Sequence, residues 1–244
     1  MPHRHHEHPS ARVSARTWWI ASLFSVGSLC FALGPLPPVA VWLGDRNDSL
    51  VFVFGAICFT CAASLSFLQV VGEGQGSGVV GSDVAGSGVV GSGVVGSGSA
   101  VRRWWQPESS DWWADGIQLI GTLAFNVTTV MAMAVGWSAR QENVRVWAPD
   151  MIGSVCFLLS SFVALSAAAA AGRQLRAADT GWWIAVLNLC GSAAFGLAAI
   201  AALVIPASGG LAAPRMDNLG TSIGGFFFLV ASLLLVTEAK EAGS

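Results

Sequence analysis

Six long apolar stretches alternate with short polar segments along the chain. A helix needs about 20 apolar residues to cross the hydrocarbon core of a bilayer. The stretches run approximately over residues 18–42, 50–71, 113–137, 150–171, 182–206 and 218–236. We therefore predict an all-α membrane protein with six transmembrane helices. The first stretch contains GPLPPV, so a kink or an unwound segment is expected at Pro35, Pro37 and Pro38.

The odd-numbered stretches share one pattern, which indicates an internal repeat. WWIASLFSVGSLCF, WWADGIQLIGTLAF and WWIAVLNLCGSAAF begin at Trp18, Trp112 and Trp182. In each, a Gly lies nine positions after the first Trp, and a Phe lies four positions after that Gly. The even-numbered stretches carry the shorter forms GAICF, GSVCF and GGFFF, so every stretch contains one Gly-x-x-x-Phe sequence. A fixed order of this kind is the signature of repeated structural units.

The physical meaning of the repeat is helix packing. Lipid provides no hydrophobic drive for helices to associate, so small residues must let the backbones approach each other. A Gly followed by a small residue opens a groove, and a Phe one turn later lies on the same face, where it fills a neighbour's groove. The predicted packing residues are Gly27, Phe31, Gly55, Phe59, Gly121, Phe125, Gly153, Phe157, Gly191, Phe195, Gly224 and Phe228. The small residues that follow the glycines are Ser28, Ala56, Thr122, Ser154, Ser192 and Gly225.

Aromatic and capping residues mark the predicted helix starts. Tryptophan is enriched at membrane interfaces, so the tryptophan pairs are predicted to anchor the odd-numbered helices there. These anchors are Trp18, Trp19, Trp112, Trp113, Trp182 and Trp183. N-capping is expected from Thr17, Asp111 and Thr180 at the odd-numbered helices, and from Asp48, Asp150 and Asp217 at the even-numbered ones.

Each odd-numbered stretch and the even-numbered one that follows form a predicted helical hairpin. Because a hairpin crosses the membrane twice, the three copies have the same orientation, and we predict a pseudo-threefold bundle. The predicted divisions are a His-rich, disordered tail (1–16), hairpin 1 (17–71), a Gly/Ser/Val linker (72–111), hairpin 2 (112–171), a short connection (172–181), hairpin 3 (182–237) and a C-terminal tail (238–244). The linker is low in complexity and is expected to be a flexible tether.

The composition supports a lipid environment. Hydrophobic residues make up 54% of the chain and charged residues only 11%, whereas soluble domains carry about 25% charged residues. The net charge of −2 argues against nucleic acid as a partner. All five cysteines lie in apolar stretches, where we expect them to pack as small hydrophobic residues. His3, His5, His6 and His8 are close together in the tail, but no second shell of residues orients them, so we expect no metal site.

The distribution of basic residues predicts the orientation. The two termini, the linker and the short connection carry eight Arg and Lys residues, whereas the alternate connections carry four. Basic residues favour the cytoplasmic side, so both termini are predicted to be cytoplasmic. Arginine is far more frequent than lysine and the chain is rich in Ala, Gly and Val, which is typical of a bacterial protein from a GC-rich genome. We therefore expect a multi-pass protein of a bacterial inner membrane.

The segments VFVFGAICFTCAAS, IQLIGTLAFNV, PDMIGSVCFL and LNLCGSAAFGLAAIAA resemble the YrhK-like membrane proteins, whose small domain is a helical hairpin with an N-x-x-G-S-x-x-F type core. The resemblance spans all three predicted hairpins. The third has the Asn of that core at Asn188, whereas the first two have Phe24 and Gln118 there. The resemblance implies a membrane location and the hairpin fold, and it implies no functional residues.

The third stretch carries a stripe of polar residues. Asp115, Gln118, Thr122, Asn126 and Thr129 are spaced so that they share one helix face. Together with Asn188, they are the predicted candidates for a polar path through the membrane. Alternatively, they form hydrogen bonds between helices, each worth about 1 kcal/mol. We favour hydrogen bonding, because no charge lies near the centre of a predicted helix, where a transport residue is expected.

Two classes of function follow from these features. The first is a non-enzymatic structural or interaction protein, with the bilayer, other membrane proteins or a second copy of the chain as partners. The alternative is a small transporter or channel for an ion or polar solute that uses the polar stripe. We predict no enzymatic activity and no cofactor, since the chain has no His beyond position 8, no Tyr, and no nucleophile with a nearby base or phosphate-binding loop.

Overall fold

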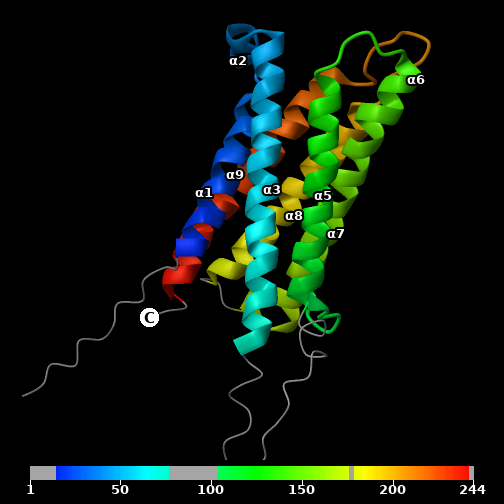
Figure 1. Cartoon of the computed structure of the whole chain (residues 1–244). Helices are drawn as coiled ribbons and strands as arrows, with labels where there is room; N and C mark the ends of the chain where they lie inside the picture. The colour runs from blue at the N-terminus through cyan, green and yellow to red at the C-terminus, as the bar shows by residue number, and fades with distance from the viewer. Residues whose placement is uncertain (1–14, 77–103, 176–178, 242–244) are drawn as a thin grey trace, which may run out of the picture.

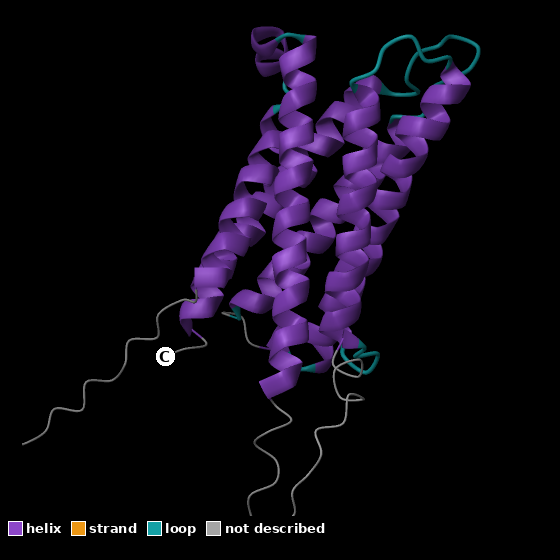
Figure 2. Ribbon diagram, viewed as in Figure 1, coloured by secondary structure: helices purple, strands orange, loops and turns teal. Residues whose placement is uncertain are grey.

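The computed structural model describes residues 15–76, 104–175 and 179–241, and within these ranges the chain is almost entirely helical (Figure 2). The elements are α1 (Ala15–Leu33), α2 (Pro37–Leu43), α3 (Asp45–Gly76), α5 (Ser110–Ala132), α6 (Ala139–Glu142), the π-helix η1 (Asn143–Trp147), α7 (Ala148–Ala170), the 3₁₀ turn η2 (Arg173–Leu175), α8 (Thr180–Ala201) and α9 (Pro214–Glu241). The described residues form no strand, apart from an isolated bridge between Val204 and Leu211.

Each of the six apolar stretches contains one long helix, which confirms the all-α class. Five of these helices, namely α1, α3, α7, α8 and α9, are long and apolar enough to cross a membrane. Helix α5 has 23 residues, but the stripe of polar residues lowers its hydropathy, so the sixth span stays a prediction. The prolines interrupt the first stretch as predicted, because α1 ends at Leu33 and α2 begins at Pro37.

The six long helices form a closed ring. Each helix packs mainly against two others, in the order α1, α3, α5, α7, α8, α9 and back to α1. All six run roughly along one axis (Figure 1). Helix α1 begins and α9 ends at the same end of the ring, together with the end of α3 and the start of α5; we call this the lower end. Helices α2 and α6 lie at the opposite, upper end.

Three pairs of helices are each joined by two glycines, one from each partner, that face each other. We call these the paired helices: α1 with α3, α5 with α7, and α8 with α9. A Cβ atom on Gly121 of α5 would lie 2.7 Å from the Phe157 ring of α7, and one on Gly153 would lie 3.1 Å from the Gly121 carbonyl oxygen and from the Phe125 ring. Each glycine therefore faces its partner glycine beneath a phenylalanine of the partner helix. Gly27 and Gly55, and Gly191 and Gly224, make the same contacts in the other two pairs. That the pairs arose as tandem repeats stays a prediction, and so does their pseudo-threefold arrangement.

Several helix starts differ from the capping predictions. The N-cap of α5 is Ser109, whose Oγ accepts from the Trp112 N–H, and that of α8 is Asp179, which accepts from the Trp182 N–H. The predicted caps Asp111 and Thr180 lie within the first turns instead. Asp150 lies inside a continuous helical segment that begins at Ala139, where Ser138 and Gln141 form a capping box. The capping role predicted for Asp150 is therefore wrong, because the polar segment before the apolar stretch is also helical.

The remaining even-numbered starts also begin earlier than the apolar pattern indicates. Asp48 follows the start of α3 at Asp45, and Asp217 lies in the first turn of α9, which begins at Pro214. Thr17 likewise lies inside α1. Helix α3 continues to Gly76, past the predicted end of hairpin 1. The predicted His-rich tail up to residue 14, linker residues 77–103, connection residues 176–178 and tail residues 242–244 lie outside the described residues.

Candidate functional site

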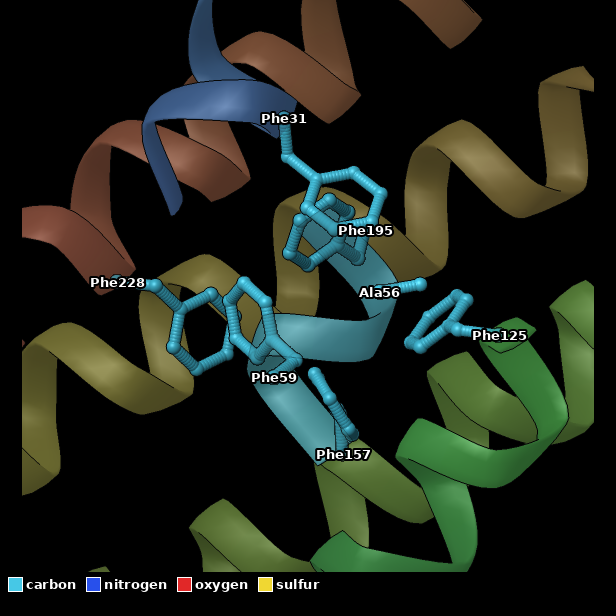
Figure 3. Close-up of a cluster of buried hydrophobic side chains, with 7 residues drawn as sticks. All are labelled: Phe31, Ala56, Phe59, Phe125, Phe157, Phe195 and Phe228. Atoms are coloured by element: carbon cyan, nitrogen blue, oxygen red, sulfur yellow. The ribbon is translucent and has the colours of Figure 1, made fainter. Parts of the chain in front are cut away.

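Six phenylalanine side chains fill the centre of the helix ring (Figure 3). We call them the phenylalanine septum: Phe31, Phe59, Phe125, Phe157, Phe195 and Phe228. Each is at most 8% exposed to solvent. The remaining gap is about 10 Å³ and is lined by Phe and Ala alone. One water molecule needs about 10–15 Å³ of such space and two or more polar partners, so the septum is dry.

The septum has two layers that come from alternate helices. Phe59, Phe157 and Phe228 of α3, α7 and α9 all contact one another, with ring centroids 6.2, 5.9 and 5.6 Å apart. Phe195 contacts both Phe31 and Phe125 in the other layer, at 5.8 and 6.0 Å. The spacing of Gly and Phe explains this arrangement, because each Gly brings two helices together and the Phe one turn later reaches the ring axis.

An upper cavity of about 240 Å³ lies above the septum, and all six long helices contribute to its wall. Phe31, Phe125 and Phe195 form its apolar floor. Its polar lining consists of Ser49, Thr128, Thr129, Asp150, Asp217, Asn218 and Thr221. Among the described residues that line it, none is basic, and the ionisable side chains are the carboxyl groups of Asp150 and Asp217.

A lower cavity of about 150 Å³ lies below the septum, between α1, α3, α5, α8 and α9. Phe228 belongs to its lining, so the septum separates it from the upper cavity. Its polar lining consists of Ser66, Asp115, Gln118, Asn188 and Ser232. The Ser66 hydroxyl of α3 donates to Asp115 Oδ2 of α5 at 2.7 Å. The carboxylate is thus held in place by a neighbouring helix.

The predicted polar stripe of α5 divides between the two cavities and the dry region between them. Asp115 and Gln118 line the lower cavity, and Thr129 lines the upper one. Thr122 is fully buried and donates to the Leu119 carbonyl oxygen at 2.8 Å. The Asn126 amide crosses to α3, where it donates to Thr60 Oγ1 and to the Ala56 carbonyl oxygen. The ends of the stripe therefore face open space, whereas its middle bonds helices together.

Asn188 joins the lower cavity from α8. Its counterparts in the repeat pattern, Phe24 and Gln118, line the same cavity. The Asn188 carbonyl oxygen accepts a hydrogen bond from Ser192 at 2.8 Å. The side-chain amide of Asn188 has no hydrogen-bond partner within the described part of the chain, so it is available to a solute in the cavity.

Asp150 and Asp217 line the upper cavity, whereas the apolar pattern predicted them to be helix caps. The spacing contained a usable signal. Asp150 lies three residues before Gly153, and Asp217 lies seven before Gly224, so each shares a helix face with a glycine of the ring interior. An aspartate on the face that carries a packing glycine is therefore directed inward.

The tryptophan pairs lie near the lower ends of α1, α5 and α8. Trp18, Trp19, Trp113 and Trp183 are 42–64% exposed. Their predicted role as interfacial anchors stays a prediction. Within residues 15–76, 104–175 and 179–241, no three His, Cys, Asp or Glu side chains are grouped as a metal site would require.

No protein-family model, curated protein or solved structure matches the chain. The resemblance to YrhK-like membrane proteins stays a prediction.

Proposed function

We propose that this protein is a multi-pass membrane protein that encloses a gated path for a small polar solute or ion along the axis of its helix ring. The observation that carries the proposal is the position of two polar cavities on opposite sides of a dry phenylalanine septum. Hydrophobic constrictions gate pores by excluding water, while polar vestibules admit solutes from each side. The arrangement corresponds to a closed path.

The outer surface of α5 supports a sixth membrane crossing. Its large exposed side chains are mainly apolar and include Ile120, Leu123, Val127 and Val130, which are 47–57% exposed. Its polar residues lie on the interior side or bond to α3. A helix with an apolar outer face and a polar inner face suits a ring that lipid surrounds and water enters. We place the protein in a bacterial inner membrane with the lower end, and hence both termini, on the cytoplasmic side.

The second candidate is a structural or interaction protein without a path. It is favoured by the dry middle of the polar stripe, where Thr122 and Asn126 bond within and between helices. In that case both cavities are closed to the aqueous phases.

Cysteine labelling separates the two functions. All five native cysteines are replaced, and single cysteines are then introduced by Thr129→Cys in the upper cavity, Gln118→Cys in the lower cavity and Ala56→Cys in the septum. We expect a membrane-impermeant maleimide to modify Thr129→Cys from the outside, Gln118→Cys from the cytoplasmic side, and Ala56→Cys from neither, because Ala56 lines the septum gap and its replacement leaves all six rings in place.

Two exposed positions serve as markers of the sides. Val135 is 97% exposed near the upper end and Leu175 is 84% exposed near the lower end, so Val135→Cys and Leu175→Cys report the orientation and reagent access. If both markers react while neither cavity position does, the cavities are dry and the path is refuted in favour of the structural function.

Transport is tested by opening the septum. In proteoliposomes, we expect Phe157→Ala to raise the leak of K⁺ or glycerol at least tenfold over the unaltered protein. Phe162 is on the same helix but is 63% exposed, so Phe162→Ala is the matched control and is expected to leave the leak unchanged. Equal leak from both variants would contradict a path through the septum.

A further inference from the structure

We propose that the lower cavity is a binding site for a monovalent inorganic cation, Na⁺ or K⁺, with the Asp115 carboxylate as its charged ligand. The inference rests on the proposed path for its role in transport, since it names the solute. Binding to the cavity is nevertheless measurable without any transport.

The polar groups of the cavity come from separate helices and offer oxygen atoms. α5 supplies the Asp115 carboxylate and the Gln118 amide, and α8 supplies the Asn188 amide. Hydroxyl oxygens come from Ser66 of α3 and Ser232 of α9. Carboxylate, amide and hydroxyl oxygens are the ligands that hard cations prefer, whereas the cavity lining offers no imidazole or thiolate for a transition metal.

Two of these groups are already arranged to receive an ion. The hydrogen bond from Ser66 to Asp115 Oδ2 fixes the carboxylate at the wall of the cavity. The Asn188 side chain has no partner within the described residues and lines the same space. The Gln118 Oε1 lies 3.4 Å from Ser160 Oγ, but the single proton of that hydroxyl is donated to the Ala114 carbonyl oxygen at 2.8 Å. The Gln118 amide is therefore able to turn toward a ligand.

The charge of the cavity lining favours an ion with a single positive charge. Among the residues that the structure describes in the cavity lining, Asp115 is the charged one. The apolar helices around the cavity lower the local dielectric constant, which strengthens the attraction between this carboxylate and a cation. Calcium and magnesium sites generally use more than one carboxylate, or substrate phosphates, which this cavity does not offer. The upper cavity also has two carboxyl groups, and no basic side chain is among the described residues of its lining.

The size of the cavity indicates that the ion keeps part of its water. A volume of about 150 Å³ exceeds the 10–15 Å³ that one water molecule needs, so there is room for a cation together with several waters. The cavity therefore has no tight cage that would match one ionic radius. We expect Na⁺ and K⁺ to bind with affinities within tenfold of each other.

The binding is tested with the full-length protein purified in detergent. NaCl and KCl are titrated at constant ionic strength against choline chloride, whose bulky cation offers no hard charge to oxygen ligands, and binding is followed by calorimetry and by thermal unfolding. We expect saturable binding of Na⁺ and K⁺. Asp115→Asn is expected to weaken it at least tenfold, and Asn188→Ala at least threefold.

The controls keep the interpretation specific. Asp115→Asn preserves the shape of the side chain and an oxygen for the Ser66 hydroxyl, so it is expected to fold and to elute as the unaltered protein does. Glu108 is an exposed carboxylate just before α5, and Glu108→Gln should leave binding unchanged. The proposal is overturned if Na⁺ and K⁺ have no more effect than choline, or if Asp115→Asn binds them as the unaltered protein does.

The two proposals fail in different ways. If K⁺ binding depends on Asp115 but Phe157→Ala leaks no more than Phe162→Ala, the cation site stands and the path is refuted. If Phe157→Ala leaks glycerol but no cation binding depends on Asp115, the path stands and the cation site is refuted.

Discussion

The interfaces within the paired helices differ in chemistry from the interfaces between the pairs. Within α1 and α3, and within α8 and α9, the contacts are glycine backbones under phenylalanine rings. Between pairs, hydroxyl and amide groups cross from helix to helix. One glycine also contributes there, since a Cβ on Gly225 of α9 would lie 2.5 Å from the backbone nitrogen of Ala32 in α1. The hydroxyl groups of Ser25 in α1 and Ser232 in α9 form a hydrogen bond at 2.8 Å, and those of Ser161 in α7 and Ser192 in α8 form one at 2.7 Å. The side-chain amide of Asn126 in α5 donates to the hydroxyl of Thr60 in α3.

The pair of α5 and α7 combines both kinds of contact. It has the glycine and phenylalanine contacts, and in addition Ser160 Oγ donates to the Ala114 carbonyl oxygen at 2.8 Å. Facing glycines under phenylalanine rings therefore join every pair, whereas the pairs are placed around the ring by directional hydrogen bonds together with the close contact of Gly225 with α1. Adjacent residues on one helix serve both purposes, since Gly191 faces α9 and Ser192 faces α7.

The largest effect on stability is expected from removing one phenylalanine side chain of the septum, at the centre of the helix ring. Phe157 is 2% exposed and touches four other phenylalanines of the septum. Phe157→Ala should lower the free energy of unfolding by about 3–5 kcal/mol, because it removes buried contacts and leaves a cavity. Denaturation in mixed micelles measures this loss. Phe162→Ala on the outer face of α7 should cost far less, and similar losses from both would show that the septum does not stabilise the ring.

A smaller loss is expected from adding one methyl group within a pair. A Cβ on Gly121 would lie 2.7 Å from the Phe157 ring and 2.9 Å from Cys156 Cβ, so α5 and α7 would have to separate. Gly121→Ala should therefore lower the free energy of unfolding by about 1–3 kcal/mol, as overpacking does elsewhere. The same denaturation in mixed micelles measures the change.

The matched control for this change lies on the same helix. A Cβ on Gly116 would have its nearest contact at 3.4 Å, in the Phe67 ring, which is an ordinary distance. Because alanine favours helix more than glycine does, Gly116→Ala should be neutral or stabilise the protein by up to about 1 kcal/mol. If Gly121→Ala and Gly116→Ala have the same effect, close approach at glycine does not hold the pairs.

The sequence predicts the shape-based contacts better than the placement of polar groups. The Gly-x-x-x-Phe spacing is local, and on a helix it fixes which residues share a face, so the spacing alone identifies the residues of the septum. The order of the six helices around the ring depends on contacts between residues far apart in the sequence. The Gly-x-x-x-Phe spacing does not indicate which face of one pair packs against the next pair. For this reason, Thr122 and Thr129 belong to one predicted stripe, yet one is dry and the other lines a cavity.

The first residues of the helices are also harder to predict from the sequence than the packing residues are. Hydropathy indicates where lipid-compatible residues begin, but it does not mark where the helix begins. The helical segment of α6, η1 and α7 begins at Ala139, more than two turns before Asp150, because the polar residues there also favour helix. An aspartate at the edge of an apolar stretch therefore has two possible roles, a cap or an inward-facing carboxylate. The number of residues between the aspartate and the packing glycine shows whether both lie on the same helix face, and this distinguishes an inward-facing carboxylate from a cap.

The smallest expected effect concerns a hydrogen bond between pairs. Ser192 Oγ donates to the Asn188 carbonyl oxygen, so in its contact with Ser161 it must accept, and Ser161 must donate. A double-mutant cycle of Ser161→Ala and Ser192→Ala should give a coupling energy of about 0.6 kcal/mol, which is typical of hydrogen bonds between membrane helices. Gly191→Ala, one residue away but directed at α9, should show no coupling to Ser161→Ala, because the two changes act on different interfaces. Coupling of Ser161 to Gly191 as strong as its coupling to Ser192 would mean that α8 transmits strain between its two faces, and the two kinds of interface would then have to be treated as one.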